Sequence, residues 1–338
     1  MKIARKKLGN SEIEVSPLGF GCWAIGGPFW LDGLPDGWGH VNDEASIRAI
    51  GRALELGINF FDTADAYGVG HSESIIGRAL KGKRHEAVIA TKFGFTHDIA
   101  TKQVYTRTDV SPAYIRKACE ASLRRLGTDY IDLYQIHVGG VPLEELDSVI
   151  ESLEGLKREG WIRSYGWSTS DAERAAAFGE RSSGVAIQHP LNVLHDDGPM
   201  IDVCERYGLS SINNSPLAMG LLSGKFDLSS SLPQDDVRGS KHEWVFYFKN
   251  GKPDAGYMDQ LEAVKEILTS GGRSPVQGAL AWIWGRSGAA VPIPGLKTET
   301  QLEEAAKALD YGPLTQGEME EIRKLLDNLL DNRDTMRN

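Results

Sequence analysis

INFFDTADAYG, residues 58–68, joins a short apolar run to two polar side chains, Asp62 and Tyr67. AVIATKFG, residues 87–94, has the same form, with Lys92 near the end of its run. Short runs rich in β-branched and aromatic residues are typical of strands buried in a parallel sheet, where both faces are covered. Each stretch therefore predicts a buried strand that ends at polar side chains.

A third stretch, YIDLYQIHVGG at residues 130–140, completes the set by placing His137 directly after its apolar run. In a barrel of parallel strands wrapped by helices, the carboxyl ends of the strands meet on one face, and that face carries the chemistry. We therefore expect a carboxylate, a phenol, an ammonium and an imidazole to lie together there. Such a group of side chains can donate and accept protons.

Working outward from these stretches, strand-like runs alternate with helix-length amphipathic segments through most of the chain. This alternation predicts a parallel sheet with helical crossovers. Eight such runs favour closure, so we predict a (β/α)8 barrel, the TIM-barrel fold of the α/β class. The expected strands are residues 16–21, 58–63, 87–91, 130–136, 161–168, 184–188, 209–217 and 289–295.

Three further segments lie outside this alternation of strands and helices. Residues 3–15 read as an N-terminal β-hairpin with a Gly-Asn turn, and residues 315–332 read as an extra C-terminal amphipathic helix. Residues 223–256 lack periodicity but hold several aromatic side chains, so we expect an ordered lid rather than a solvated tail. Because no linker or repeat interrupts the chain, we expect residues 1–338 to form a single domain.

Polar and proline residues predict where three of the helices start. Asp43 is placed to cap the helix expected at residues 44–57, and Ser111 is placed to cap the helix that Pro112 opens. Pro142 is placed to open the helix that follows the fourth strand. A side-chain oxygen at a helix start accepts a backbone N–H of the first turn, and proline fits the first helical position.

The composition is that of an ordinary globular protein, with 338 residues, 41% of them hydrophobic and 25% charged, and a net charge of −10. The negative charge argues against nucleic acid and against anionic membranes as partners. Three widely spaced cysteines predict no disulfide framework and fit a reducing compartment. No apolar region of a signal peptide follows the basic start, and no apolar run approaches about 18 residues, so we expect a cytoplasmic protein without a membrane span.

Each of the four polar side chains alone has an ordinary structural explanation, but together at successive strand ends they favour a catalytic site. A buried ammonium beside a phenol stabilises the phenolate, so we expect Lys92 to lower the pKa of Tyr67. Asp62 would keep Lys92 charged and in place. His137 would orient a substrate oxygen through a hydrogen bond. The eight histidines of the chain show no metal-ligand spacing, and we expect no metal.

Seven stretches, in this order along the chain, resemble the aldo-keto reductase family: LGFGCWAIGG, FFDTADAYGVGHSESIIGRAL, IATKFGF, YIDLYQIH, IRSYGWSTS, SPLAMGLLSGKF and PIPGLKTETQLEEA. The resemblance covers the chain from about residue 6 to residue 310. It implies a (β/α)8 barrel that uses NADPH without a metal. It also implies that Asp62, Tyr67, Lys92 and His137 are the catalytic tetrad, with Tyr67 as the general acid in carbonyl reduction.

The resemblance further implies which residues hold the cofactor. Ser168 and Gln188 resemble the residues at the nicotinamide carboxamide, and Lys297 resembles a cation that faces the 2′-phosphate. A cation there favours NADPH over NADH. The whole expected cofactor-binding set is Gly21, Trp23, Asp62, Ser168, Thr169, Gln188, Asn214, Ser215, Leu217, Lys225, Gly295, Lys297, Gln301 and Glu304.

Three positions depart from the usual pattern of the family. Thr169 and Ala305 stand where the family usually has Asn. Asn214 stands where an aromatic ring usually stacks on the nicotinamide. The sequence therefore predicts a nicotinamide that lacks its usual aromatic shelf.

The predicted activity is hydride transfer between NADP(H) and a small-molecule aldehyde, ketone or alcohol. The loop after the first strand holds the polar residues Asp32, Asp36 and His40 among its tryptophans, which is compatible with a sugar-like or other polar substrate. The alternative is a cofactor-binding regulatory subunit of the same fold, like the potassium-channel beta subunits, and a homo-oligomer is compatible with either. The residues expected to contact the substrate are Trp23, Trp30, Tyr67 and His137.

Overall fold

The central element of the computed structural model, which describes residues 3–337, is an eight-stranded parallel sheet. The backbone N–H groups of Gly19 and Gly21 donate to the carbonyl oxygens of Pro292 and Pro294, both at 2.9 Å. These bonds join the first strand to the last, so the sheet closes and the predicted (β/α)8 barrel is confirmed. The strands, in spatial order, are β3 (Phe20–Gly21), β6 (Phe60–Asp62), β7 (Val88–Phe93), β10 (Ile131–Ile136), β11 (Ile162–Ser168), β12 (Ala186–Pro190), β13 (Ser210–Asn214) and β16 (Ala290–Pro292).

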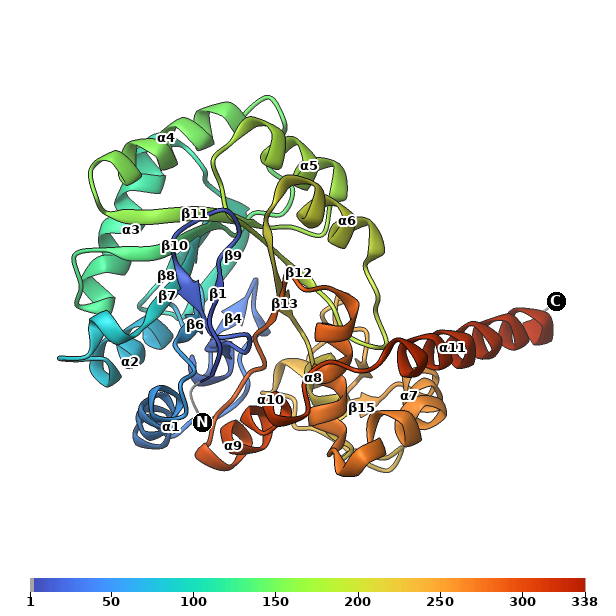
Figure 1. Ribbon diagram of the computed structural model, residues 1–338. Helices are drawn as coiled ribbons and strands as arrows, with labels where there is room; N and C mark the ends of the chain where they lie inside the picture. Colours follow the sequence, from blue (N-terminus) through green and yellow to red (C-terminus); the bar gives the residue numbers. More distant parts are fainter. Residues whose placement is uncertain (1–2, 338) are drawn as a thin grey trace.

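Helices surround the barrel on its outside (Figure 1). Helix α4 presents one apolar stripe to the strands, since its buried Leu146, Val149 and Leu153 recur at helical spacing. The extra C-terminal helix, α11, packs against α7 and α8 outside the barrel. The helices are α1 (Asp43–Glu55), α2 (His71–Ala79), α3 (Pro112–Leu126), α4 (Leu146–Arg158), α5 (Ala172–Arg181), α6 (Gly198–Tyr207), α7 (Ala255–Leu268), α8 (Pro275–Arg286), α9 (Glu299–Ala306), α10 (Ala308–Tyr311) and α11 (Gln316–Arg337).

Strand β7 shows how the alternation of side chains positions the polar site. Val88 and Ala90 pack in the cluster that fills the barrel, while Ile89 and Phe93 pack in the larger cluster between strands and helices. Side chains on a strand alternate between its faces with a period of two. Lys92 therefore shares the inner face with Ala90 and projects into the barrel one layer further along.

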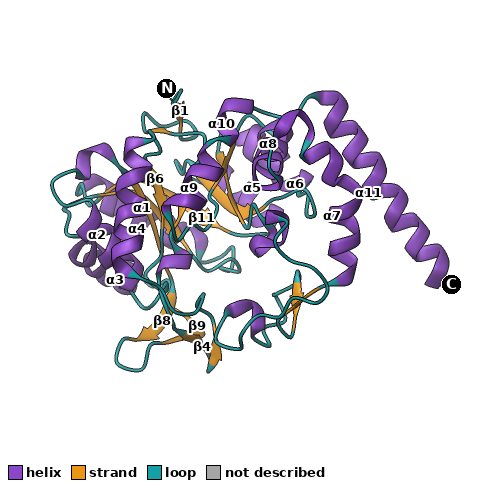
Figure 2. Ribbon diagram, turned by 90° about the horizontal axis from the view of Figure 1, so that it is seen from below, coloured by secondary structure: helices purple, strands orange, loops and turns teal. Residues whose placement is uncertain are grey.

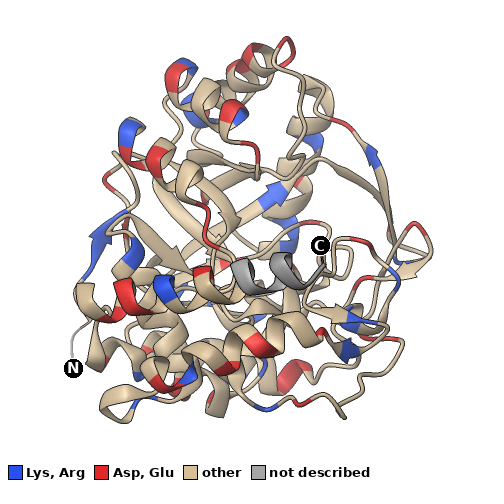
Figure 3. Cartoon of the chain, turned by 90° about the vertical axis from the view of Figure 1, so that its right-hand side faces the viewer, with Lys and Arg blue, Asp and Glu red and all other residues tan. Residues whose placement is uncertain are grey.

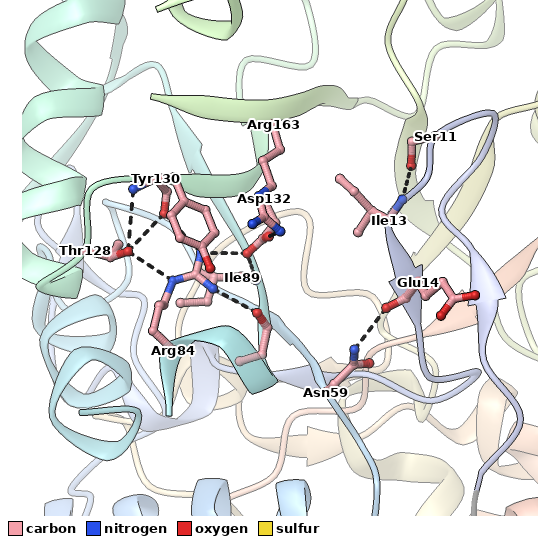
Figure 4. Close-up of polar contacts among 11 residues, drawn as sticks. Ser11, Ile13, Glu14, Asn59, Arg84, Ile89, Thr128, Tyr130, Asp132 and Arg163 are labelled. Carbon is pink, nitrogen blue, oxygen red and sulfur yellow. Dashed lines mark hydrogen bonds and ion pairs between the residues drawn. The ribbon is translucent and has the colours of Figure 1, made fainter. Parts of the chain in front are cut away.

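The N-terminal hairpin, β1 (Lys6–Lys7) and β2 (Glu14–Val15), lies across one end of the barrel (Figure 1). Leu8 and Val15 are fully buried there and pack against the interior cluster of the barrel. Asn59 anchors the hairpin, since its Nδ2 donates to the carbonyl oxygen of Glu14 at 2.9 Å (Figure 4). The hairpin closes the amino-terminal end of the barrel, so the opposite face remains for the site.

A second polar cluster holds the same end together (Figure 4). The buried carboxylate of Asp132 accepts from Arg84 Nη2 at 2.6 Å and from Arg163 Nη1 at 3.0 Å. The ring of Tyr130 lies near both guanidinium groups, at 4.0 and 4.2 Å from their Cζ atoms. This cluster joins the starts of β7, β10 and β11, a face of the barrel that serves stability.

The carboxyl face of the barrel carries a small sheet that the sequence did not predict. It consists of β4 (Trp30–Leu31), β5 (Leu34–Pro35), β8 (Phe95–Asp98) and β9 (Gln103–Thr108), in the order β5-β4-β9-β8. Figure 2 shows it at the end of the barrel opposite the N-terminal hairpin. The loops after the first and third barrel strands thus support each other beside the polar strand ends.

Residues 223–256 are compactly folded, although their sequence has no clear periodicity. They contain a 3-10 turn, Val237–Gly239, and a hairpin of β14 (Phe248–Lys249) and β15 (Lys252–Pro253). Val237, Val245 and Phe248 are buried in a cluster with α7 and α8. Tyr247 and Phe248 therefore belong to a packed structure, whereas Trp244 and Phe246 are exposed.

One of the three predicted helix starts agrees with the structure. Ser111 caps α3, with Pro112 at its first position, as predicted. The predicted cap of α1 is wrong, because Asn42 accepts from Ala45 N at 3.0 Å and Asp43 lies inside the helix. The predicted start of α4 at Pro142 is also wrong, since the helix begins at Leu146 after a turn.

Acidic and basic residues are interspersed over the helices and loops (Figure 3).

Within residues 3–337, no helix combines the length and the apolarity that crossing a membrane requires. Cys22, Cys119 and Cys204 are buried free thiols.

Candidate active site

The structure brings the four polar side chains of the strand ends together inside the carboxyl face of the barrel. Lys92, fully buried, donates from Nζ to Asp62 Oδ2 at 2.7 Å, to the Thr63 carbonyl oxygen at 2.8 Å and to Tyr67 Oη at 3.2 Å. The rings of Tyr67 and His137 meet edge to face, with centroids 5.9 Å apart. All three donor positions of the ammonium are thus used, and one of them fixes the phenol.

Two amides complete the surroundings of Asp62. Gln135 Nε2 donates to Asp62 Oδ1 at 3.1 Å, and Gln188 Nε2 donates to the same oxygen at 2.8 Å. Sequence reasoning missed Gln135, although it follows Leu133 by two on the inner face of β10 and lies opposite Lys92 in the register of β7 and β10. Lys92 and the two amides thus donate three hydrogen bonds to this buried carboxylate.

Backbone geometry places Tyr67 at the mouth of the barrel. Gly68, with φ +62°, lies so close to the carbonyl oxygen of Gly26 that a Cβ would overlap it. This close approach brings the loop after the first strand against Tyr67, and the ring of Trp23 stacks on the phenol with centroids 6.0 Å apart. Glycine is therefore required at position 68 both for its backbone conformation and for its lack of a side chain.

Burial and neighbouring charges shift the pKa values of Tyr67, Lys92 and His137, and the directions of these shifts decide which of the three can give up a proton. Burial raises the pKa of Tyr67, and the nearby charge of Lys92 only partly opposes this rise. The expectation that Lys92 lowers the pKa of Tyr67 below its ordinary value is therefore wrong. Burial alone would lower the pKa of Lys92, but Asp62 and Tyr67 outweigh burial and raise it. Burial, followed by the charge of Lys92, holds the pKa of His137 well below its ordinary value.

These directions assign protonation states at neutral pH. Tyr67 is a neutral phenol, Lys92 is an ammonium and His137 is a neutral imidazole. Because Lys92 already donates to the phenol oxygen, the proton of Tyr67 is free to be donated elsewhere. A neutral imidazole can orient an oxygen by a hydrogen bond but has no acidic proton to give. The geometry therefore makes Tyr67 the proton donor of the group.

Residues expected at the nicotinamide end lie at the ends of β11 and β12. Ser168 is half-buried at the end of β11, next to Gln188 in the register of the two strands. The side chain of Thr169 joins the loops after β10 and β11, since its Oγ1 donates to the carbonyl oxygen of Gly139 at 2.9 Å and accepts from Asp171 N. Ser168 is thus the register partner of Gln188, and the backbone N–H of Thr169 donates to the Gln188 carbonyl oxygen at 3.0 Å.

Residues expected at the phosphate and adenosine ends lie around the last strand. Gly21 pairs with Gly295 where the barrel closes, and a Cβ on Gly21 would come within 2.5 Å of the Ile293 carbonyl oxygen. Gln301 Oε1 accepts from the backbone N–H of Lys297 at 2.8 Å. The carbonyl oxygen of Glu304 accepts from α8, and its side chain has no hydrogen bond within the described residues.

A cluster of positive charge surrounds the side chain of Lys297. Burial lowers its pKa, and Arg238 and Lys225 lower it further, while Asp236 opposes them. Arg238 is itself buried and forms a two-point contact with Asp236, at 2.8 and 2.7 Å. Three cations against one carboxylate leave net positive charge, which fits a phosphate-bearing ligand.

Sequence reasoning missed Arg238 in this cluster. The residue lies in the aperiodic residues 223–256, where no strand or helix pattern marks a position. Its guanidinium packs on the ring of Trp38, 4.7 Å from the centroid, and Lys297 Nζ donates to the carbonyl oxygen of Trp38 at 2.6 Å. These long-range contacts appear only when the chain has folded.

The loop after β13 carries the remaining expected cofactor residues. Ser215 adopts a left-handed backbone conformation with φ +51°, as do Ala218 and Met219 beyond it. Leu217 is half-buried between the two large core clusters. The side chain of Asn214, at the end of β13, has no hydrogen-bond partner within residues 3–337. Three left-handed residues within positions 215–219 give this loop a strained backbone, of the kind that clusters at ligand-binding sites.

Tryptophans border the site on the side of the first loop. Trp23 contacts Tyr67, Trp38 and Trp244, with ring centroids 6.0, 5.2 and 5.9 Å apart. Trp30 lies on β4, and no ring contact joins it to Tyr67 or His137 among the described residues. The structure therefore places Trp23, but not Trp30, directly against the phenol.

Comparison with known proteins gives one consistent match. A sequence model of the aldo/keto reductase family matches residues 17–327. An aldo-keto reductase of Schizosaccharomyces pombe, whose name includes NADP(+), is 31% identical over 97% of this chain and 93% of its own length. The glycerol dehydrogenase structure from Gluconobacter oxydans has a TM-score of 0.80 at 30% identity and covers 96% of this chain and 95% of its own. The holo form of an aldo-keto reductase from Bacillus halodurans has a TM-score of 0.76 at 32% identity and covers 96% of each chain.

Proposed function

The chain belongs to the aldo/keto reductase family, and we propose on that basis that it is an NADP(H)-dependent oxidoreductase that interconverts an aldehyde or ketone with its alcohol. The observation that carries this proposal is the buried hydrogen bond from Lys92 to Tyr67 beside a neutral His137. In this arrangement Tyr67 keeps a proton that it can donate. The relatives named as a reductase and as a glycerol dehydrogenase support the same reaction class.

In the proposed reaction, Tyr67 donates its proton to the carbonyl oxygen of the substrate. His137 orients that oxygen through a neutral imidazole N–H, and its buried Nδ1 has no hydrogen-bond partner within the described residues. Lys92 donates to the phenol oxygen throughout and stabilises the negative charge that develops on it. Asp62, held by Gln135 and Gln188, keeps Lys92 in place. Bound NADPH supplies the hydride.

The cationic cluster is the proposed place for the phosphates of NADP(H). Burial and the charge of Arg238 lower the pKa of Lys225, and burial, Arg238 and Lys225 lower the pKa of Lys297, although Asp236 opposes both shifts. A phosphate monoester carries close to two negative charges at neutral pH and would balance these cations. We assign the 2′-phosphate to Lys297, as its position after the last barrel strand indicates.

Residues 223–256 act, in this proposal, as a lid over the same cluster within one domain formed by the whole chain. Val237 N donates to the carbonyl oxygen of Gly37 at 2.7 Å, which ties the segment to the loop after the first strand. Since Arg238 and Trp38 also touch, the lid and the cofactor site share residues. We favour an enzyme over a channel-type regulatory subunit because the proton-donating group is intact and the matched relatives bear the names of enzymes.

The test of this function is steady-state oxidation of NADPH and of NADH with a panel of aldehydes and ketones. The proposal expects turnover with at least one carbonyl compound and a preference for NADPH. Tight binding of NADPH with no turnover across the panel, and none in the reverse direction with alcohols, would favour the regulatory subunit instead.

Cofactor choice should depend on Lys297. We predict that Lys297→Met weakens NADPH binding by about 1.5–3 kcal/mol, the range for a hydrogen bond to a charged group, and barely changes NADH binding. Fluorescence titration of the enzyme with each cofactor measures both. Lys307→Met, at an exposed position on the neighbouring surface, is the matched control. An equal loss of binding free energy for NADPH and NADH would show that Lys297 does not contact the 2′-phosphate.

Asn214 should limit how tightly the nicotinamide is held. We predict that Asn214→Tyr tightens NADP(H) binding by up to about tenfold, because an added aromatic stack contributes about 0.5–1.5 kcal/mol. Turnover of the native substrate should fall, since the ring occupies space now open to a polar group. Cofactor titration and steady-state kinetics of the same variant measure the two effects. A cofactor complex with another aromatic ring against the nicotinamide face would contradict this prediction.

A further inference from the structure

Unpartnered polar atoms gather at one place beside the site. Nine buried side-chain nitrogen and oxygen atoms have no hydrogen-bond partner among the described residues. Three of them, Asp36 Oδ1, Trp38 Nε1 and His242 Nε2, come from the loop after the first strand and from the lid segment that covers it. Buried polar groups without partners are uncommon in folded proteins because each costs free energy. Three in contact with one aromatic cluster therefore point to a ligand.

Asp36 and His242 face each other without forming a proper hydrogen bond. Asp36 Oδ1 lies 3.3 Å from His242 Nε2, and the two side chains are only 14% and 7% exposed. The two atoms nevertheless lack the alignment that a hydrogen bond requires. The ring of His242 is held by stacking on Trp244, with centroids 5.3 Å apart.

The contact between Asp36 and His242 is not needed to hold the loop after the first strand against residues 223–256. Val237 N already bonds to the Gly37 carbonyl oxygen, and Lys297 Nζ bonds to the Trp38 carbonyl oxygen. The guanidinium of Arg238 also packs on the ring of Trp38.

One indole ring connects this pair to the proton donor. Trp23 Nε1 donates to the backbone oxygen of Asp36 at 3.1 Å, and its ring stacks on Tyr67. Trp244, which carries His242, packs against the same indole with centroids 5.9 Å apart. The charge of Asp36 is also close enough to contribute to the raised pKa of Tyr67. The pair is thus connected to Tyr67 through the indole ring of Trp23.

We propose that Asp36 and His242 together bind a hydroxyl group of the substrate, so that the site selects hydroxylated aldehydes and ketones, and the corresponding polyols, over unsubstituted ones. This inference rests on the proposed function. A hydroxyl is both a donor and an acceptor, so it can donate to Asp36 Oδ1 and accept from His242 Nε2–H at once. Trp38 Nε1 offers a further donor for a neighbouring hydroxyl. The faces of Trp23 and Trp244 offer apolar surface for the carbon chain between the hydroxyls.

The experiment compares kcat/KM for two matched pairs of substrates, glyceraldehyde with propanal and erythrose with butanal. The wild-type enzyme should prefer the hydroxylated member of each pair by roughly 10- to 100-fold, the value of one hydrogen bond to a charged group. In His242→Phe, which keeps the stacking on Trp244, that preference should fall by a similar factor. Asp36→Leu, of similar size, should produce the same fall. Glu243→Gln, at an exposed position next to His242, is the control and should keep the preference.

An unchanged preference in folded His242→Phe would overturn the inference and would mean that the pair holds only an ordered water. If Asp36→Leu does not fold, the result with His242→Phe decides. An equal fall of kcat/KM for the hydroxylated and the unsubstituted aldehyde would also overturn the inference. Asp36 and His242 would then support the site as a whole and would not select the hydroxyl group. Failure of the proposed function is distinguishable, since the wild-type enzyme would then oxidise NADPH with none of the four aldehydes, and the inference would fall with it.

Discussion

Replacing Tyr67 by Phe should lower kcat for carbonyl reduction by roughly 10²–10⁴-fold, the usual contribution of a positioned general acid. The substitution removes only the hydroxyl that accepts from Lys92, and it leaves the ring that stacks on Trp23. Cofactor binding should therefore stay near that of the wild-type enzyme. Steady-state kinetics and cofactor titration on the same preparation measure the two quantities.

The pH dependence of the wild-type enzyme follows from the raised pKa of Tyr67. The phenol stays protonated through neutral pH, so kcat/KM for reduction should be flat there and decline only above its ordinary pKa of about 10. The rate of the reverse oxidation should rise with pH over the same range.

The control for Tyr67→Phe is Tyr105→Phe, which makes the same chemical change at an exposed position on β9 and should leave the kinetics unchanged. If Tyr67→Phe kept the wild-type kcat with chemistry rate-limiting, another group would be the acid.

Replacing Lys92 by Met should damage both stability and activity. Lys92 is fully buried and paired with Asp62 at 2.7 Å, so its removal leaves an uncompensated carboxylate in the barrel. Breaking a buried ion pair in this way costs about 3–5 kcal/mol of the free energy of unfolding. The rate of reduction should also fall by at least about 10²-fold, because the phenol loses the charge that stabilises its anion. Denaturant unfolding and steady-state kinetics measure the two losses.

The matched control is Lys81→Met, since Lys81 is an exposed lysine after α2. A surface change of this kind should stay within about 0.5 kcal/mol. Adding Asp62→Asn to Lys92→Met should restore part of the stability but none of the activity, because the amide removes the stranded charge without restoring the cation. A Lys92→Met protein as stable as the wild-type protein would show that Asp62 is neutral in the barrel.

The barrel and the proton-donating group could be predicted from the sequence because their signals are local. Each strand run is a few apolar residues long, and period-two alternation carries Lys92 to the inner face two residues beyond Ala90. Asp62 and His137 lie at or next to a strand end, so the parallel arrangement alone brings them together.

Features that depend on contacts between distant segments could not be predicted. Arg238 joins the cationic cluster only because the lid segment folds over Trp38, and nothing in its local sequence marks that contact. The β4–β9 pairing likewise joins two loops more than 70 residues apart, Trp30 to Gln103. The direction of the pKa of Tyr67 was missed for a related reason. A sequence shows the neighbouring charge of Lys92, but only the folded structure shows how fully the phenol is removed from water.

The most direct test of the central claim is the transfer of deuterium to glyceraldehyde from NADPH that carries two deuterium atoms at the nicotinamide C4, followed by mass spectrometry of the product alcohol. The account predicts one deuterium at the former carbonyl carbon with the wild-type enzyme, and about 10²–10⁴-fold slower labelling with Tyr67→Phe at full cofactor occupancy. Labelling at the same rate in both proteins, or an unlabelled alcohol from the wild-type enzyme, would contradict it.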